Sequence, residues 1–272
     1  MQTGRRVKVS AISANTKPSR MGHSRSNNSE APLFVVGLAS FMHPVARPLL
    51  VSLFATALVT ALAYALPDRH AATGVGLAFL AVTYVMVLRG NDDQVRHYGL
   101  ALGGLLEPGP LSAKRTLLDG GKAIAWAASF AAVILPLFWM GFVLWWHPKH
   151  PFHFVAPKSV YDEILGQILV IALPEEAFYR GYLQQALDDA LPGKIRVAKA
   201  SIGWGLPITC AIFAAGHFLT EPNPQRLAVF FPAIVFGWLR ARTGGLGASI
   251  AFHAMSNIFS ASLGRGYGLF SG

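Results

Sequence analysis

Apolar runs long enough to cross a membrane recur along most of this chain, and short polar segments separate them. A helix that crosses the hydrocarbon core of a bilayer needs about 20 consecutive apolar residues. Charged residues make up only 13% of the 272 residues, about half of what soluble globular domains carry. Because lipid can take the place of water around such a surface, the pattern predicts an all-α, polytopic bundle of transmembrane helices.

Seven runs are predicted to span the membrane, with Pro136 kinking the third and Pro174 interrupting the fourth. Another apolar run, Leu33–Met42, is too short to span and is expected to be interfacial or re-entrant. If it enters the bilayer fully, the number of spans becomes eight. The seven expected helices cover residues 49–66, 71–88, 123–146, 160–187, 201–219, 226–239 and 246–263.

Basic residues set the expected orientation and domain organisation. Residues 1–30 hold six basic residues and one acid, so they are predicted to form a disordered, basic cytoplasmic tail. Residues 31–272 are expected to form a single membrane-embedded domain, with its motifs at about 160–264. Seven crossings from a cytoplasmic N-terminus put the polar connection 89–122 and most other basic residues inside, as the positive-inside rule requires. The abundance of Ala, Gly, Leu and Arg hints at a bacterial inner membrane.

The net charge of +10 does not indicate nucleic-acid binding, because the basic residues lie between apolar runs and not along one face. The single cysteine, Cys210, excludes an internal disulfide. No internal repeat of the transporter kind is present. The expected partner at this point is therefore the lipid bilayer, while the oligomeric state stays open.

Three charged residues interrupt the apolar run 164–183: Glu175, Glu176 and Arg180. Charges at membrane depth are costly and are kept mainly for pairing or for function. Glu176 and Arg180 are four residues apart and share a helix face, so they are expected to pair. The neighbouring Glu175 faces another direction, because a helix turns about 100° per residue. Glu175 is therefore the carboxylate without a partner built into its helix.

Two more pairs have the same four-residue spacing, Phe213 with His217 and His253 with Asn257. Polar groups in lipid should turn inward, so three polar helix faces are expected to meet. A carboxylate with an imidazole can activate water, and an imidazole with a carboxamide can supply donors to an oxyanion. Taken singly, each residue has a plainer reading: an interhelical hydrogen bond for the histidines and Asn257, core packing for Phe213, and a structural ion pair for Glu176 and Arg180.

The sequence Pro174-Glu-Glu-Ala-Phe-Tyr-Arg-Gly-Tyr-Leu183 resembles the EExxxR motif of the CPBP intramembrane proteases, the CAAX-protease and bacteriocin-processing (Abi) family. Phe213–His217 matches the family's FxxxH motif and His253–Asn257 its HxxxN motif. Residues 236–250 also look like the family's segment before the last motif. The resemblance covers residues 165–259, and one departure is Tyr179, where the family often has Phe.

The resemblance implies a role for each matched residue. Glu175 would be the general base that activates water, with His217 helping to hold that water. Glu176, paired with Arg180, would shape the site, while His253 and Asn257 would stabilise the oxyanion. Phe213 and Tyr179 would line the site. Members are classed as glutamic endopeptidases, so no cofactor is expected.

A divalent metal is the alternative to a glutamic mechanism. The chain has no HExxH motif, but Glu175, His217 and His253 could form a three-ligand zinc site. A second histidine group, His147, His150 and His153, lies in the predicted outer loop and is read as solvated side chains.

Other functions remain open at this point. The cavity could bind a peptide without cleaving it, as in bacteriocin immunity, or Glu175 and His217 could relay protons in a transporter. A cysteine protease built on Cys210 and His217 is a further alternative, because seven residues place both on one helix face. The sequence does not identify the substrate, which could be a prenylated tail, a bacteriocin leader or a C-terminal sorting tail.

Overall fold

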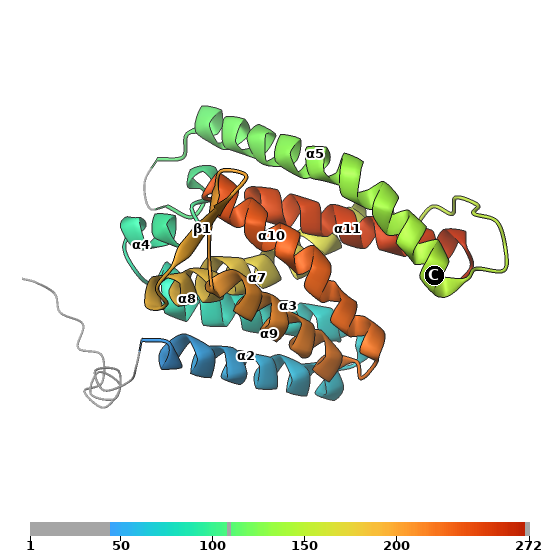
Figure 1. Cartoon of the computed structure of the whole chain (residues 1–272), viewed down its shortest axis with the longest axis horizontal. Coiled ribbons are helices and arrows are strands. Elements are labelled where there is room, and N and C mark those ends of the chain that lie inside the picture. Colours follow the sequence, from blue (N-terminus) through green and yellow to red (C-terminus); the bar gives the residue numbers. More distant parts are fainter. Residues whose placement is uncertain (1–43, 108–109, 270–272) are drawn as a thin grey trace, which may run out of the picture. The chain divides into compact units, whose positions relative to one another are not determined.

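Helices dominate the computed structural model, which describes residues 44–107 and 110–269 as parts of one unit (Figure 1). The predicted tail 1–30 and the short apolar run at 33–42 lie outside the described residues, so both stay predictions. The elements before the middle of the chain are α2 (Ala46–Ala65), α3 (Asp68–Thr83), the π-helical η1 (Tyr84–Leu88), α4 (Asp92–His97), the 3-10 helix η2 (Leu102–Gly104) and α5 (Ala113–Trp146).

The second half of the unit begins with one continuous helical segment from Val160 to Ala190. Its parts are α6 (Val160–Leu165), the π-helical η3 (Gly166–Ala172), α7 (Leu173–Glu176), the π-helical η4 (Ala177–Leu183) and α8 (Gln184–Ala190). The strands β1 (Lys194–Val197) and β2 (Ala200–Gly203) follow, and then α9 (Gly205–Thr220), the 3-10 helix η5 (Pro224–Val229), α10 (Phe230–Thr243) and α11 (Gly247–Gly266).

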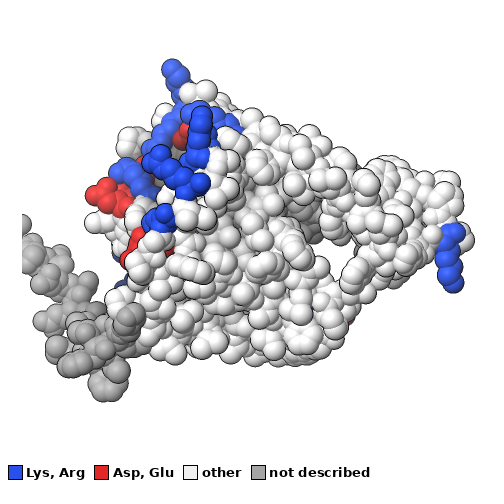
Figure 2. All heavy atoms as spheres, viewed as in Figure 1, with Lys and Arg blue, Asp and Glu red and all other residues white. Residues whose placement is uncertain are grey.

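Among the described residues, three helical segments are long and apolar enough to cross a membrane: α2, α3 with η1, and α5. Their outer faces expose large apolar side chains such as Leu53, Leu77 and Leu144. Figure 2 shows that on this face the charged side chains gather where α4, β1 and the start of α5 lie, and that a broad uncharged surface follows. An exposed apolar band with charges beyond it is the arrangement expected of a protein immersed in lipid.

The structure corrects several predicted boundaries. The third helix starts at Ala113 and not at residue 123, so the predicted polar connection 89–122 is helical in its last part and also contains α4 and η2. Ser112 caps α5 by accepting a hydrogen bond from the Arg115 amide, and a serine cap of this kind stabilises the start of a helix. The sixth helix also differs, because residues 224–229 form a 3-10 helix and α10 runs on to Thr243.

A two-stranded hairpin is a departure from the predicted all-α fold. β1 and β2 pair antiparallel, with Val197 opposite Ala200, so the fifth helix begins at Gly205 and not at residue 201. The turn consists of Ala198 and Lys199, both at positive φ (47° and 67°). Hairpin turns of this kind usually contain Asn or Gly, and the absence of either residue explains why the sequence pattern did not reveal the hairpin.

Wide helical turns flank Pro174 on both sides, in η3 and η4. Proline has no amide hydrogen to donate and its ring crowds the preceding turn, and π-helical turns in α-helices occur frequently at functional sites. The predicted interruption at Pro174 therefore takes the form of widened turns within a continuous helix. The third helix likewise continues through Pro136 without a break in its assignment.

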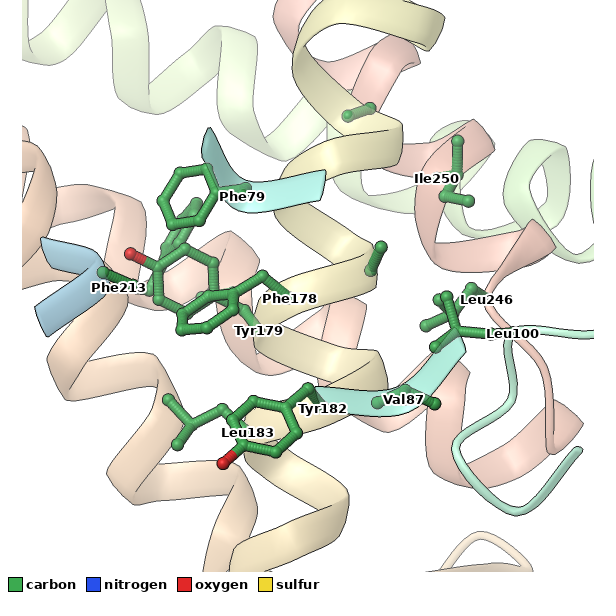
Figure 3. Close-up of a cluster of buried hydrophobic side chains, with 14 of the residues drawn as sticks. Phe79, Val87, Leu100, Phe178, Tyr179, Tyr182, Leu183, Phe213, Leu246 and Ile250 are labelled. Carbon is green, nitrogen blue, oxygen red and sulfur yellow. The ribbon is translucent and has the colours of Figure 1, made fainter. Parts of the chain in front are cut away.

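The core packs aromatic residues of the Val160–Ala190 segment against α3 and α9. We call this segment the broken helix, because π-helical turns interrupt its α-helical pattern although its backbone stays helical. Figure 3 shows Phe178 and Tyr179 close to Phe79 and Phe213. The ring centroid of Phe79 lies 5.1 Å from that of Phe178 and 5.3 Å from that of Tyr179. The ring centroids of Tyr179 and Phe213 are 4.9 Å apart. These contacts fix the part of the helix that carries Glu175 and Glu176.

A glycine contact between α3 and η3 gives a test of this packing. A Cβ atom on Gly76 would lie 2.5 Å from the backbone oxygen of Val170, whereas one on Gly120 of α5 would meet nothing within 4 Å. Alanine favours helix over glycine by about 1 kcal/mol. We expect Gly120→Ala to leave the melting temperature in detergent unchanged or higher, and Gly76→Ala to lower it because backbone atoms must move apart. Equal melting temperatures for the two variants would contradict the close packing of α3 on η3.

Candidate active site

Four helical segments bring the predicted site residues together. Glu175 and Glu176 end α7, Tyr179 and Arg180 follow in η4, Phe213 and His217 lie on α9, and His253 and Asn257 lie on α11. Because α7, α9 and α11 are separate in sequence, only tertiary packing can place these side chains near one another. One cavity, of about 630 Å³, is lined by Glu175, Tyr179, Phe213, His217, His253 and Asn257.

The predicted ion pair between Glu176 and Arg180 is confirmed. Arg180 Nη1 lies 3.0 Å from Glu176 Oε1, and both side chains are fully buried. The same carboxylate oxygen is 2.9 Å from His253 Nδ1, and Arg180 Nη2 donates to the backbone oxygen of Ala233 at 3.4 Å. Glu176 therefore ties the broken helix to α11, and Arg180 ties it to α10.

Two phenylalanines enclose the charged pair. The guanidinium carbon of Arg180 lies 4.4 Å from the ring centre of Phe213 and 5.1 Å from that of Phe236. Phe236 also stacks on His253 with 4.6 Å between ring centres and an interplanar angle of 12°. A guanidinium over aromatic faces gains electrostatic attraction that is strongest away from water. Phe213 thus packs against Arg180 and also lines the cavity, the position that the sequence analysis predicted for it.

Glu175 differs from its neighbour in exposure and in its access to the cavity. Its side chain is 13% exposed and lines the cavity, and Glu175 Oε2 lies 3.8 Å from His253 Nε2. Within the described residues, this oxygen has no hydrogen-bond partner. Glu176 is held through its Oε1 by Arg180 and His253 and does not line the cavity, whereas Glu175 is available to a molecule in the cavity.

The histidines have one ring nitrogen each bound to the protein. His253 Nδ1 faces Glu176, and His217 Nδ1 lies 3.1 Å from the backbone oxygen of Phe213. Since a carbonyl or carboxylate oxygen can only accept, each Nδ1 carries the proton. In the neutral ring, Nε2 is then an acceptor. His217 Nε2 can accept a hydrogen bond from water, whereas His253 Nε2 donates only when both ring nitrogens are protonated.

Asn257 lies where it was predicted but has a partner that the sequence analysis missed. Its Nδ2 donates to Gln167 Oε1 at 2.9 Å, and Gln167 lines the same cavity from η3. A signal was present, because Gln167 is a lone polar residue in an apolar stretch, eight positions before Glu175. Phe236 was also missed as a site residue, and an aromatic residue in an apolar helix gives no comparable signal.

Two of the alternative sites gain no geometric support. Cys210 is 1% exposed and does not line the cavity with His217. The loop histidines are not gathered, and His153 instead uses its backbone amide to bind the oxygen of Gly266 at 2.9 Å. Within the part of the chain that the structure describes, no three His, Cys, Asp or Glu residues form a group suited to a metal ion.

Comparison with known proteins connects this geometry to a family. Residues 158–259 match the family model described as type II CAAX prenyl endopeptidase Rce1-like, which is part of the CPBP family. The match spans the broken helix, α9, α10 and most of α11, and so contains every predicted site residue. No curated protein and no solved structure gave a significant match. The segment at residues 158–259 is therefore similar to the Rce1-like group of the CPBP family, the family that its motifs resemble.

Proposed function

We propose that this protein is an intramembrane endopeptidase in which Glu175 activates water to hydrolyse a peptide bond of a membrane-associated peptide or protein tail. The family match supports a CAAX-type protease function in general terms. The observation that carries the finer proposal is the difference between the two glutamates: Glu175 alone lines the cavity, beside His217.

The reaction follows from the groups around the cavity. Glu175 takes a proton from a water molecule that also donates a hydrogen bond to His217 Nε2. The water oxygen bonds to the peptide carbonyl carbon, and the carbonyl electron pair moves onto oxygen. The oxyanion accepts hydrogen bonds from Asn257 and from His253 protonated at both nitrogens. Collapse of this intermediate breaks the C–N bond, and the proton held by Glu175 passes to the leaving amine.

Gln167 and Glu176 hold the oxyanion donors in place. The bond from Asn257 Nδ2 to Gln167 Oε1 uses one amide hydrogen and leaves the second for substrate. Glu176 fixes the His253 ring through Nδ1 and so directs Nε2 toward Glu175. Donors fixed before the reaction stabilise a developing charge without reorganisation, and this is often the largest single contribution to catalysis.

Replacing the base tests the proposal. We expect Glu175→Gln and His217→Ala to lower peptide cleavage sharply, Glu175→Gln by roughly 1,000-fold or more, because loss of a general base typically costs 100- to 10,000-fold. The purified variants are incubated with a library of membrane-anchored peptides, and products are read by mass spectrometry.

Glu107→Gln is the matched control for these variants. Glu107 binds Arg96 and Arg115 in the polar connection and does not line the cavity. This variant should retain full activity, and all three proteins should elute as folded protein. Full activity in both Glu175→Gln and His217→Ala would disprove the mechanism.

We propose that the reaction needs no metal. The donor set of Glu175, His217 and His253 would suit zinc chemically, and the bond of His253 Nδ1 to Glu176 leaves Nε2 free. Two observations favour a reaction without metal: within the described residues no three such side chains are gathered closely enough to hold an ion, and Asn257 offers an oxyanion donor without a Lewis acid. Activity is therefore expected to survive exhaustive dialysis against EDTA and 1,10-phenanthroline. Loss of cleavage on chelation, restored by added Zn²⁺, would replace the glutamic mechanism with a metal-dependent one.

A further inference from the structure

The cavity occupies one half of the helical unit. It is lined near the end of α2 by Ala63, near the start of α3 by Ala72, at the end of α9 by Thr220 and in the last third of α11 by Ser260. These four positions all lie next to one end of the unit, the end with the α2–α3 turn. Of the described residues, none in α4, α8, β1 or β2 contributes to its wall.

The candidate catalytic residues form the inner boundary of this cavity. Gln167 lies eight residues before Glu175 on the broken helix, a distance of about 12 Å at the helical rise of 1.5 Å per residue. Both residues line the cavity, and Gln167 is nearer the α2–α3 turn. The cavity thus extends from Glu175 toward that end, and we call this end the turn end and the other the hairpin end, after β1 and β2.

The two ends carry different numbers of basic residues. Of the basic residues in the described part of the chain, five lie at the turn end and eleven at the hairpin end, while Arg180 is buried between them. The basic residues of the turn end are Arg69, Lys149, Lys158, Arg226 and Arg265. Those of the hairpin end are Arg47, Arg89, Arg96, Lys114, Arg115, Lys122, Lys194, Arg196, Lys199, Arg240 and Arg242. Basic residues in short loops stay on the cytoplasmic side, whereas acids have little influence on orientation.

The geometry points to substrate entry from the non-cytoplasmic side. We propose that the candidate active site receives peptides whose scissile bond lies in the outer half of the bilayer, such as exported or membrane-anchored segments reaching it from outside. This inference deepens the proposed function and rests on it for the identity of what enters. The side of entry rests only on the cavity and on the charges.

The cavity walls fit a peptide segment lying partly in lipid. One wall is apolar and comes from α3 and α5, with Val75, Ile134 and Phe138. The facing wall on α11 carries Ser256 and Ser260, whose hydroxyl groups can bind a peptide backbone. Figure 2 shows the surface hollowed near α10, where α10 and α11 separate in Figure 1. An extended peptide could therefore place apolar side chains on one wall and backbone groups on the other.

Cysteine accessibility tests the side of entry without an assay of proteolysis. Three single-cysteine proteins are made on a Cys210→Ala background. Ser260→Cys reports on the cavity, Lys149→Cys on the loop at the turn end, and Leu111→Cys, 59% exposed in the wild type, on the hairpin end. Intact cells or right-side-out vesicles are treated with a sulfonated, membrane-impermeant maleimide before and after permeabilisation.

We expect Ser260→Cys and Lys149→Cys to react in intact vesicles and Leu111→Cys to react only after permeabilisation. Reaction of Leu111→Cys in place of Lys149→Cys would show the opposite orientation and overturn the proposal. Reaction of Lys149→Cys without reaction of Ser260→Cys in intact vesicles would show that the cavity is closed to the outer side, which also overturns it.

Failure of the proposed function would give a different result. The same labelling is repeated with Glu175→Gln added to Ser260→Cys, a protein expected to be inactive. If this protein and Ser260→Cys alone label alike, the side of entry is established whether or not cleavage is ever observed. If the peptide library gives no cleavage while Ser260→Cys labels from outside, only the proteolytic function is disproved.

Discussion

The fully buried contact between Glu176 and Arg180 is the interaction on which the rest of this structure depends. Removing one partner of such a pair costs about 3–5 kcal/mol, because the other charge stays buried without compensation. Here the pair does more than neutralise itself. Glu176 also binds His253 of α11, and Arg180 also binds the backbone of α10 and contacts Phe213 of α9. One ion pair thus joins four helical segments at the depth where the candidate chemistry takes place.

Adjacent positions give the two glutamates different environments. About 100° of rotation separates neighbouring side chains on a helix, so Glu175 does not face Arg180 as Glu176 does. Glu175 turns to the cavity, where its Oε2 is 3.8 Å from His253 Nε2. His253 lies between the two carboxylates, with one ring nitrogen toward each. Glu175 therefore has the fixed ring of His253 on one side and the cavity on the other. A general base needs this kind of fixed position within reach of a water molecule.

Much of this architecture could be predicted from sequence, since membrane depth makes polar residues conspicuous. The apolar runs gave α2, α3 with η1, and α11 to within a few residues, and the four-residue spacings gave the correct pairing of Glu176 with Arg180. Polar residues on apolar helices carry a cost that marks them individually. This is why Glu175, His217, His253 and Asn257 were identified before their convergence could be known.

The features that the sequence analysis missed are those that no costly polar residue in an apolar helix signals. Hydropathy locates an apolar run and not the capped polar turns before it, so the start of α5 at Ala113 was placed ten residues late. A hairpin turn made of Ala198 and Lys199 contains neither Asn nor Gly. The bond of His253 to Glu176 depends on the packing of α11 against the broken helix. The spacing of His253 and Asn257 could place both on one face, but it could not assign their partners.

The division of labour between the glutamates is the central claim, and thermal unfolding tests it most directly. Melting temperatures of Glu175→Gln and Glu176→Gln are measured in the same detergent, since each substitution keeps the side-chain shape and removes one charge. The account predicts a large drop for Glu176→Gln, which leaves Arg180 buried without its counter-ion, and little change for Glu175→Gln, whose Oε2 has no protein hydrogen bond to lose. Equal drops, or a larger drop for Glu175→Gln, would contradict it.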